Sequence, residues 1–292
     1  MALGAFLCQQ HAIASFLMVS EVDDLLSPCP ELQRFVEGYW QRHGSYQPAK
    51  RVRVLADACT KIIFELVPMP WPSCYVIATQ LTPIIVTLTG EVHRIGIRFR
   101  PGMAGFFLNR SLDGLGDRLT SFTEVSVAEG EQMLGQLREA CSLSVRVHLV
   151  DGWLLSLLAA AQPDFHVVAE TSRLSHGMRN GLPPPALAGL MGWPERRLQR
   201  VCRERFGATA ANLHRFYRFE ILQKRLNSHP VELADLAAEL RFSDQAHMAR
   251  EFRHFAGTTI SSFLRERVDV GNVQDKGDWL PVLRRAEESG IW

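Results

Sequence analysis

The sequence lacks the patterns by which several classes of protein are recognised. It has no C-x-x-C pair and no cysteine–histidine spacing that suits zinc, so neither a metal site nor a disulfide framework is expected. Catalytic patterns such as G-x-S-x-G, a Walker loop or paired carboxylates are also absent, which disfavours an enzyme and predicts no cofactor. In a reducing cytoplasm the cysteines are expected to be small buried thiols: Cys8, Cys29, Cys59, Cys74, Cys141 and Cys202.

The first 20 residues are apolar, but they do not read as a targeting segment. They carry no basic leader, and Gln9, Gln10 and His11 interrupt them. The stretch is also too short and too polar for a membrane-spanning helix, which needs about 20 apolar residues. We therefore expect a cytoplasmic protein without a membrane partner, and Met18 is an alternative start.

The chain as a whole has no excess of charge of one sign, but individual segments do. The formal net charge is +1. Residues 1–170 hold 13 Lys/Arg against 17 Asp/Glu, residues 171–268 hold 16 against 9, and residues 269–292 hold 3 against 5. A basic segment beside an acidic one predicts a nucleic-acid-facing module joined to a second domain. Charge alone leaves DNA, RNA and acidic lipid as alternatives.

The front half is predicted to be a β-rich domain closed by helices. Residues 51–68 and 74–100 alternate Val, Ile and Thr with polar residues, which is typical of strands. Breaks are expected at Pro70, Pro72, Pro83 and Gly90. This pattern predicts a barrel or jelly-roll-like domain over residues 1–163, with ligand-sensing and dimerisation roles.

Three segments around these strands are predicted to be helical: 30–41, 126–137 and 147–161. The last carries an apolar stripe, and packing on the sheet is the favoured interpretation, with a dimer seam as the alternative. The stripe consists of Trp153, Leu154, Leu155, Leu157 and Leu158.

The C-terminal part is predicted to be all-helical with an approximate repeat. Residues 184–207 and 231–257 each hold a short Leu/Ala helix, a tight turn with an aromatic residue, and a second helix. Pro194 fits a helix start in the first unit, and Ser243 or Asp244 can cap the second. Residues 212–227 form a long amphipathic helix between the units, with Leu213, Phe216, Ile221, Leu222 and Leu226 buried. The fold class is therefore α+β, with two helix-turn-helix units joined by a long helix.

The second helix of each unit carries candidate DNA-reading residues. In the first unit Leu198, Val201 and Cys202 are expected to face inward. In the major groove, arginine pairs with guanine and glutamine pairs with adenine. Alanine can contact the methyl group of thymine, and we expect this contact for Ala246. The DNA-binding candidates are Arg196, Arg197, Gln199, Arg200, Arg203, Gln245, His247 and Arg250, and the expected phosphate contacts are Arg218, Lys224 and Arg253. For any single arginine, a solvated helix face is the alternative.

Residues 238–259 (AELRFSDQAHMAREFRHFAGTT) resemble the signature of the AraC/XylS family of transcription regulators. The resemblance covers about residues 164–268, departing at Arg241, where a turn glycine is usual, and at Ile260, where a proline is usual. It implies a homodimeric, sequence-specific regulator that binds promoter DNA and contacts RNA polymerase. Activation is the expected mode, with repression left open. More weakly, residues 30–40, the β-rich stretch and residues 96–102 (GIRFRPG) resemble the sensor domains found ahead of such DNA-binding halves.

The strand at 93–100 (HRIGIRFR) is the candidate ligand site. Side chains alternate along a strand, so Arg94, Gly96, Arg98 and Arg100 share one face. Clustered arginines suit phosphates or purine stacking. With residues 109–114 (NRSLDG), the strand gives R-x-x-x-R followed by [D/N]-x-S-x-x-G, which resembles the cyclic-di-GMP fingerprint of PilZ domains. That resemblance implies a ligand site of Arg94, Arg98, Arg100, Asn109, Ser111 and Gly114.

AraC-like activators of the CuxR type resemble this combination, which would imply control of exopolysaccharide genes. Three alternatives stay open. Arg98 could pair with a carboxylate, such as that of Asp113 or Asp117, while Asn109 and Ser111 cap a turn. The effector could be a sugar or another small metabolite. As a remote alternative an enzyme could be fused to the DNA-binding part, with His93 as its general base.

Overall fold

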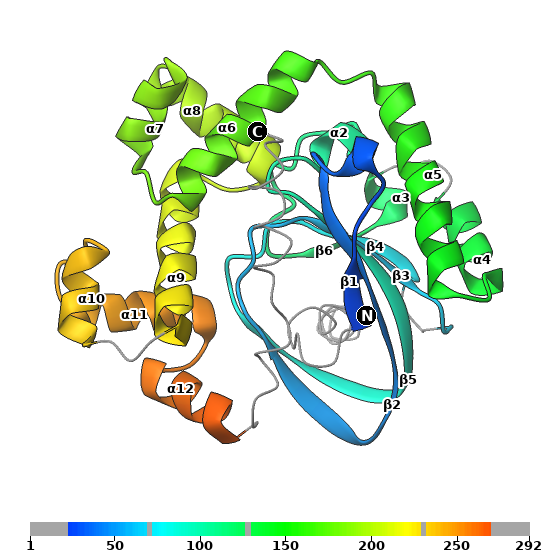
Figure 1. The fold of residues 1–292 in the computed structure, drawn as a ribbon, viewed down its shortest axis with the longest axis horizontal. Coiled ribbons are helices and arrows are strands. Elements are labelled where there is room, and N and C mark those ends of the chain that lie inside the picture. Colours follow the sequence, from blue (N-terminus) through cyan, green and yellow to red (C-terminus); the bar gives the residue numbers. More distant parts are fainter. Residues whose placement is uncertain (1–22, 69–71, 126–129, 229–231, 270–292) are drawn as a thin grey trace.

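A computed structural model describes residues 23–68, 72–125, 130–228 and 232–269. It consists of a curled antiparallel sheet flanked by helices and a second, all-helical body (Figure 1). The α+β class and the order of the two parts are as the sequence predicts. The expected tail over 269–292 lies outside the described residues after its first position.

A single sheet of six strands forms the front half, in the order β1-β2-β5-β3-β4-β6. All neighbouring strands are antiparallel. The sheet curls into a half-barrel rather than closing into a full barrel (Figure 1). The strands are β1 (Asp23–Leu26), β2 (Val36–Val54), β3 (Lys61–Glu65), β4 (Cys74–Ile77), β5 (Ile84–Phe99) and β6 (Leu119–Ser121).

The two long strands β2 and β5 make the backbone of the half-barrel. Gly90 does not break β5 as predicted; it has a φ of 68° and lies opposite the register shift between Tyr46 and Lys50 of β2. Gly96 pairs with Trp40, whose indole Cε2 would lie 2.0 Å from a Cβ at position 96. Only glycine therefore lets the Trp40 ring lie across β5.

The helix predicted over 30–41 is wrong. A 3₁₀ turn, η2 (Pro30–Leu32), is all the helix that forms there, and β2 begins at Val36. Residues 36–40 (VEGYW) hold a β-branched residue and two aromatic residues, which favour a strand, and pairing with β5 overrides the local amphipathic pattern.

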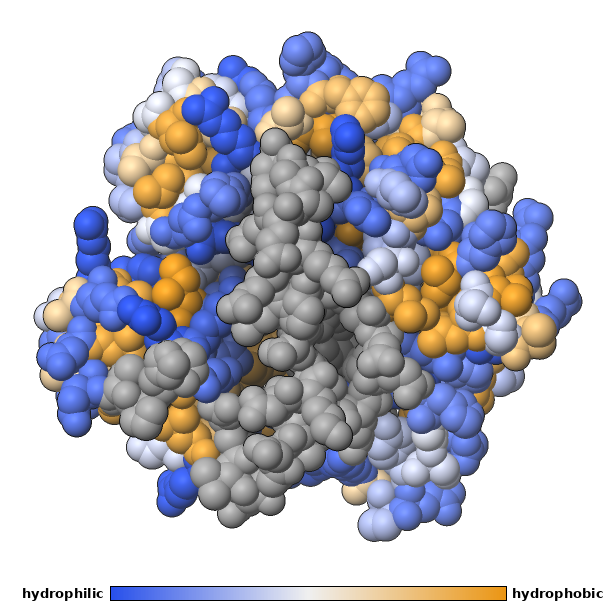
Figure 2. All heavy atoms as spheres, viewed as in Figure 1, coloured by the Kyte–Doolittle hydropathy of each residue, from blue (hydrophilic) through white to orange (hydrophobic). Residues whose placement is uncertain are grey.

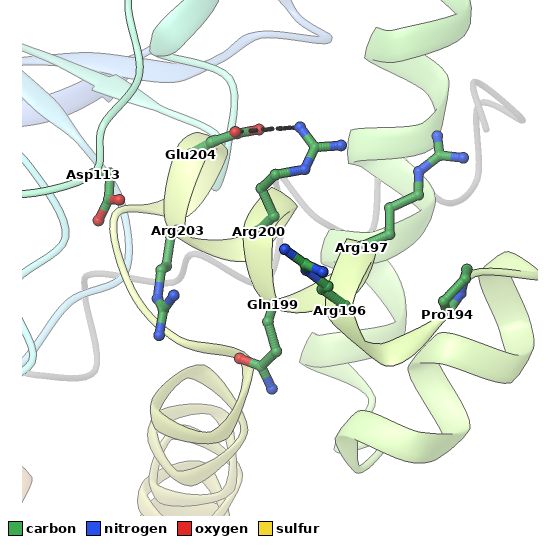
Figure 3. A pocket seen from close by; sticks show the side chains of 8 residues that line it. All are labelled: Asp113, Pro194, Arg196, Arg197, Gln199, Arg200, Arg203 and Glu204. Atoms are coloured by element: carbon green, nitrogen blue, oxygen red, sulfur yellow. Dashed lines mark hydrogen bonds and ion pairs between the residues drawn. The ribbon is translucent and has the colours of Figure 1, made fainter.

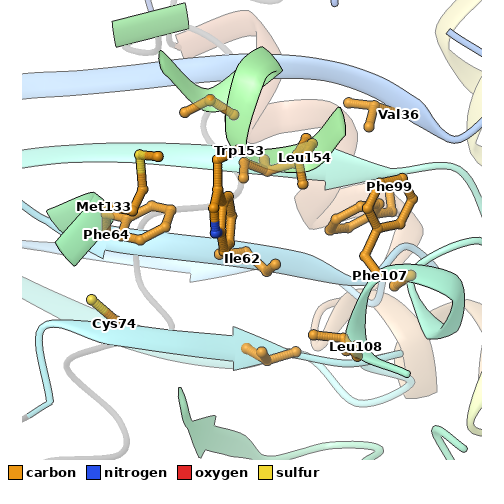
Figure 4. Packing of buried hydrophobic residues seen from close by; sticks show 14 of the residues in the cluster. Val36, Ile62, Phe64, Cys74, Phe99, Phe107, Leu108, Met133, Trp153 and Leu154 are labelled. Atoms are coloured by element: carbon orange, nitrogen blue, oxygen red, sulfur yellow. The ribbon is translucent and has the colours of Figure 1, made fainter. Parts of the chain in front are cut away.

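Four helices cover the convex face of the sheet: α2 (Gly105–Leu108), α3 (Phe122–Val125), α4 (Gly130–Glu139) and α5 (Leu143–Ala161). The helix predicted at 147–161 begins four residues earlier, because Ser142 caps its N-terminus by accepting a hydrogen bond from the Val145 amide. Figure 4 shows Trp153 and Leu154 reaching down from α5 onto Ile62 and Phe64 of the sheet. The apolar stripe therefore does pack on the sheet, as favoured.

The C-terminal body contains α6 (Phe165–Arg179), α7 (Pro184–Met191), α8 (Glu195–Phe206), α9 (Ala210–Ser228), α10 (Leu233–Glu239), α11 (Gln245–Ala256) and α12 (Ile260–Asp269). The two predicted units are confirmed as α7–α8 and α10–α11, and α9 runs between them (Figure 1). Leu213, Phe216, Leu222 and Leu226 of α9 are buried as expected, whereas Ile221 is half-buried.

The turn between the two helices of each unit uses a left-handed residue. In the first unit this is Gly192, with a φ of 65°. In the second unit Arg241 takes the same conformation, with a φ of 56°. The second unit therefore keeps the turn geometry despite the missing glycine. A side chain in that conformation is strained, so this turn is less favourable than the glycine turn of the first unit.

Candidate nucleic-acid interface

Helix α8 presents its arginines outward because its apolar residues anchor it inward. Leu198, Val201 and Cys202 are buried, as predicted, together with Phe206. Arg196, Arg197, Arg200 and Arg203 are exposed and Gln199 is half-buried. These five side chains, with Pro194, Asp113 and Glu204, line a hollow of about 610 Å³ (Figure 3).

The five candidate side chains of α8 are not equally free to contact a ligand. Arg197 lies 4.3 Å from the centre of the Trp193 ring, and its Nη2 is 3.2 Å from Glu170. Arg200 pairs with Glu204 one turn later, at 3.1 Å. Arg196 and Arg203 have no ion pair within the described part of the chain, so of the α8 arginines these two are the most available for DNA.

Helix α11 begins with a cap that involves one of its candidate residues. Asp244 accepts a hydrogen bond of 2.6 Å from the His247 amide, which lowers the pKa of the Asp244 carboxyl. The His247 Nδ1 lies 3.0 Å from Ser243 Oγ, and its ring stands edge-on to Phe242. His247 therefore supports the start of the helix, while Gln245 and Arg250 are exposed.

The two outward faces correspond at two basic positions. When the buried pairs Leu198/Met248 and Cys202/Phe252 are matched, Arg200 corresponds to Arg250 and Arg203 to Arg253. Arg253 is predicted to contact a phosphate, and its match with Arg203 gives it the same position on the second helix.

Helix α9 holds α11 through a bidentate ion pair. Arg215 donates from Nε and Nη2 to Glu251 at 2.9 and 2.8 Å. These hydrogen bonds lower the pKa of the Glu251 carboxyl. Arg218, an expected phosphate contact, stacks 3.9 Å from the centre of the Phe242 ring. Both contacts fix the second unit on the connecting helix.

Two of the three strand arginines, Arg94 and Arg98, form ion pairs within the protein. Arg94 is only 2% exposed, and its Nε lies 2.6 Å from Glu65. Glu65 also accepts a hydrogen bond from the Tyr75 hydroxyl, at 2.7 Å. The alternation of Arg94 and Arg98 on one face, with Ile95 and Ile97 in the core on the other, is confirmed.

Arg98 joins a buried network that its sequence neighbours did not indicate. It donates to Glu37 and Asp57, so the alternative that Arg98 pairs with a carboxylate is confirmed, although the partners are not the suggested Asp113 or Asp117. Lys61 also pairs with Asp57, at 2.6 Å. Burial raises the pKa of both carboxyls, but the guanidinium of Arg98 outweighs it and holds the pKa of Glu37 and Asp57 below their usual range.

The loop over 109–114 lies apart from these ion pairs. Asn109 and Gly114 have φ values of 47° and 76°, and Ser111 Oγ accepts a hydrogen bond of 3.1 Å from the Asp113 amide, so the turn-capping role is confirmed. A hollow of about 460 Å³ beside this loop is lined by Leu108, Asn109, Arg110, Ser111, Asp113 and Val125. None of the three strand arginines lines it, and Arg100 donates instead to the Gln33 carbonyl at 2.7 Å. The structure thus does not bring the two elements of the fingerprint into one cavity.

Sequence reasoning missed the contacts between the two bodies. Thr79, Ala56 and Leu112 donate hydrogen bonds to carbonyl groups of α8 or α11. Each joins residues more than 90 positions apart, so no local pattern could have indicated them.

Two family models match the chain, and neither covers half of it. Residues 25–121 match the "Domain of unknown function (DUF6597)", and residues 187–266 match the "Helix-turn-helix domain". No curated protein matches. Among solved structures, ToxT from Vibrio cholerae is 9% identical, covering 77% of this chain and 97% of that one at a TM-score of 0.41. Unsaturated fatty acid-bound wild-type ToxT from Vibrio cholerae is 12% identical, covering 74% and 94% at a TM-score of 0.37.

Proposed function

We propose that this chain, whose residues 187–266 belong to the helix-turn-helix domain family, is a sequence-specific regulator that reads promoter DNA with two helices. The domain makes it a DNA-binding regulator of transcription rather than an enzyme. The observation that carries the finer proposal is the pair of matched basic faces on α8 and α11, joined by α9. We expect contact with RNA polymerase and activation of transcription.

The chemistry of each face assigns roles to its side chains. We assign base reading to Arg196, Gln199 and Arg203 of α8 and to Gln245 and Arg250 of α11, because these candidates, unlike Arg197 and Arg200, have no intramolecular ion pair among the described residues. Arg197, held by Trp193 and Glu170, suits a fixed phosphate contact that positions the helix. Of the other candidates, Arg200 would have to break its ion pair with Glu204 to reach a base. His247 would have to break its contact with Ser243 at the start of α11.

The test is selection of bound sites from a random duplex library by the full-length protein. Arg203→Ala should relax the preference at one base position and weaken binding by about 1–3 kcal/mol. Arg197→Ala should weaken binding to all sites alike and make the dependence on salt shallower. Arg51→Ala, an exposed arginine of β2, is the matched control. Failure of the wild-type protein to select any sequence would refute the proposal.

For the front half we propose an effector-binding role, and cyclic-di-GMP remains the specific candidate. Two exposed members of the fingerprint, Asn109 and Ser111, line a hollow at the surface, which supports it. Arg94 and Arg98 would have to leave Glu65, Glu37 and Asp57 to reach a ligand, which weighs against their predicted role. Control of exopolysaccharide genes would follow only if this ligand binds.

Calorimetric titration of the full-length protein with cyclic-di-GMP tests the effector. Asn109→Ala and Ser111→Ala are the informative variants, because both side chains are exposed and their loss should not unfold the protein. Binding that both variants weaken supports the ligand. If the folded wild-type protein does not bind cyclic-di-GMP, this ligand is not the effector, and a sugar or another small metabolite is the remaining alternative.

We also propose a homodimer whose seam is α5. Only 22% of the most apolar window of this helix is buried, although its length and composition alone would allow it to span a membrane. Figure 2 shows apolar side chains at the surface in the region of α4 and α5. Val145 is 41% exposed, so Val145→Lys should produce monomers in sedimentation, whereas Ser144→Lys should not.

A further inference from the structure

The C-terminal ends of both DNA-reading helices are held by the front domain. Thr79, which follows β4, donates from its hydroxyl to the carbonyl of Phe206, the last residue of α8. Ala56, which follows β2, donates from its amide to the carbonyl of Phe255 near the end of α11, at 3.2 Å. The last carbonyls of a helix have no partner within the helix, so the front domain satisfies one in each.

These two donors belong to one small piece of backbone pairing. Asp57 and Gln80 form an isolated antiparallel bridge, with amide-to-carbonyl distances of 2.6 and 2.8 Å. Ala56 precedes Asp57, and Thr79 precedes Gln80. The donor for α11 and the donor for α8 are therefore tied to each other by two hydrogen bonds, and neither can move far alone. We call Ala56, Asp57, Thr79 and Gln80 the clamp.

A third arm reaches α8 from the loop after α2. The Leu112 amide donates to the Glu204 carbonyl at 2.8 Å. Asp117 ties that loop to the clamp, since its amide donates to the Thr79 carbonyl at 3.0 Å and its Oδ1 accepts from the Leu81 amide at 2.8 Å. Two different front-domain segments thus meet on the last turn of α8.

The fit around these contacts leaves no room for side chains. The glycines that end α8 and α11, Gly207 and Gly257, have φ values of 69° and 67°. A Cβ on Gly207 would lie 3.1 Å from the Leu112 carbonyl oxygen, and one on Gly257 would lie 3.1 Å from Pro83 Cγ. Both helix ends therefore lie directly against the front domain.

Buried charges anchor the clamp to the sheet. The Asp57 side chain pairs with Arg98 of β5 and with Lys61 of β3, and it accepts a hydrogen bond of 3.0 Å from the Cys59 amide. Glu37, the other partner of Arg98, lies 4.0 Å from Arg179 of α6. The network therefore joins β5 to the clamp and to the first helix of the DNA-binding body.

We propose that the clamp holds the C-terminal ends of α8 and α11 together and thereby sets the separation at which the two helices read DNA. This inference rests on the proposed DNA-binding function. Helices that enter successive major grooves must lie about 34 Å apart, so a shift of one helix relative to the other changes the spacing of half-sites that both can reach. Thr79 is a positioning residue in this arrangement, because it touches α8 and not the DNA.

Hydrogen exchange in the full-length protein tests the clamp directly. The reporters are the amides of Ala56 and Leu112, which donate hydrogen bonds across the interface to α11 and α8 respectively. Thr79→Val removes the hydroxyl donor, and we expect both amides to exchange about tenfold faster, equivalent to about 1.4 kcal/mol. Thr79→Ser keeps the donor and should restore the wild-type rates. Thr120→Val is the matched control, since Thr120 is equally buried and its hydroxyl has no hydrogen-bond partner within the described part of the chain.

The DNA readout distinguishes positioning from simple stability. For wild type and Thr79→Val, affinity is measured for a selected site and for the same site with one base pair inserted between its halves. We expect the wild-type preference for the uninterrupted site to fall at least threefold in Thr79→Val and to remain in Thr79→Ser and Thr120→Val. If Thr79→Val does not fold, Asp117→Ala removes the side-chain acceptor of the Leu81 amide and loosens the third arm, and the same changes are expected.

Unchanged exchange at both reporter amides overturns the clamp. Faster exchange with an unchanged spacing preference overturns its role in setting helix separation. If the wild-type protein selects no DNA, the regulatory function itself fails, and the positioning role falls with it. Exchange rates that still respond to Thr79→Val would then identify the clamp as an interface between the two bodies only.

Discussion

Replacing Arg98 by alanine should destabilise this protein far more than replacing its neighbour Arg100. Arg98 neutralises two buried carboxylates, Glu37 at 9% exposed and Asp57 at 6% exposed. Removing one partner of a buried ion pair costs about 3–5 kcal/mol, because a charge remains in a poorly solvating environment. Lys61 still pairs with Asp57 in the variant, so we expect the lower end, about 3 kcal/mol.

Arg100→Ala is the matched control for this substitution. Arg100 donates a single side-chain hydrogen bond, to the carbonyl of Gln33, and it is only half-buried. Its loss should lower the free energy of unfolding by about 1 kcal/mol. The difference of about 2 kcal/mol between the two variants isolates the effect of the unpaired carboxylates.

Urea denaturation followed by tryptophan fluorescence and by far-ultraviolet circular dichroism measures both variants. Trp40 and Trp153 are buried in the front domain and Trp193 is buried in the C-terminal body, so the fluorescence reports the unfolding of both bodies. The circular dichroism signal is dominated by the helices. If the denaturation curves show two transitions instead of one, a free energy of unfolding is fitted to each transition separately. A free energy of unfolding for Arg98→Ala within about 1 kcal/mol of wild type would refute the reasoning, since a merely exposed or ligand-binding arginine behaves in that way.

The pH dependence supplies a second check with a definite sign. The folded-state pKa values of Glu37 and Asp57 lie below their unfolded values, so their stabilisation is present at neutral pH and is lost as pH falls below about 4. Without Arg98, we expect burial to raise the pKa of both carboxyls instead. Protonation at low pH then removes the buried negative charges and lessens the destabilisation of the variant. The stability difference between wild type and Arg98→Ala should therefore shrink from pH 7 to pH 4.

Three further substitutions or labels test other parts of the structure. Arg241→Gly should stabilise the second unit by about 1 kcal/mol, because Arg241 has a left-handed φ, whereas Arg241→Ala keeps that strain; thermal unfolding compares them. Gly96→Ala should destabilise the sheet by about 1–3 kcal/mol, since its Cβ would overlap Trp40, while Gly152→Ala on the open face of α5 should be neutral or slightly stabilising in the same assay. Burial raises the pKa of the Cys202 thiol to about 12, so a thiol reagent at neutral pH should label exposed Cys141 at once and Cys202 only on unfolding; equal rates would contradict the packing of α8.

Local pattern was sufficient wherever an element carries its own periodicity and end signals. The α7–α8 and α10–α11 units, the long helix α9 and the inward position of Leu198, Val201 and Cys202 could all be derived from spacing alone. An amphipathic helix determines its buried face through its sequence. The same holds for β5, where alternation correctly separated Arg94 and Arg98 from Ile95 and Ile97.

Local pattern failed where pairing across the sheet decided the structure. Residues 36–40 have a helix-like apolar spacing but form the start of β2, because their backbone groups pair with β5. Gly90 looked like a break in the strand and instead lies at a register shift that lets β5 continue. In both places the energy comes from a partner strand that is distant in the sequence.

The sequence by itself determined that this protein has a β-rich front domain, a basic all-helical domain with two helix-turn-helix units, and arginines on the outer face of α8. Only the tertiary structure decided what the other charged groups do. Arg98 pairs with Glu37 and Asp57, and Thr79 meets the end of α8 across 127 positions of sequence. Such contacts depend on how two folded bodies pack against each other, and no local periodicity encodes that packing.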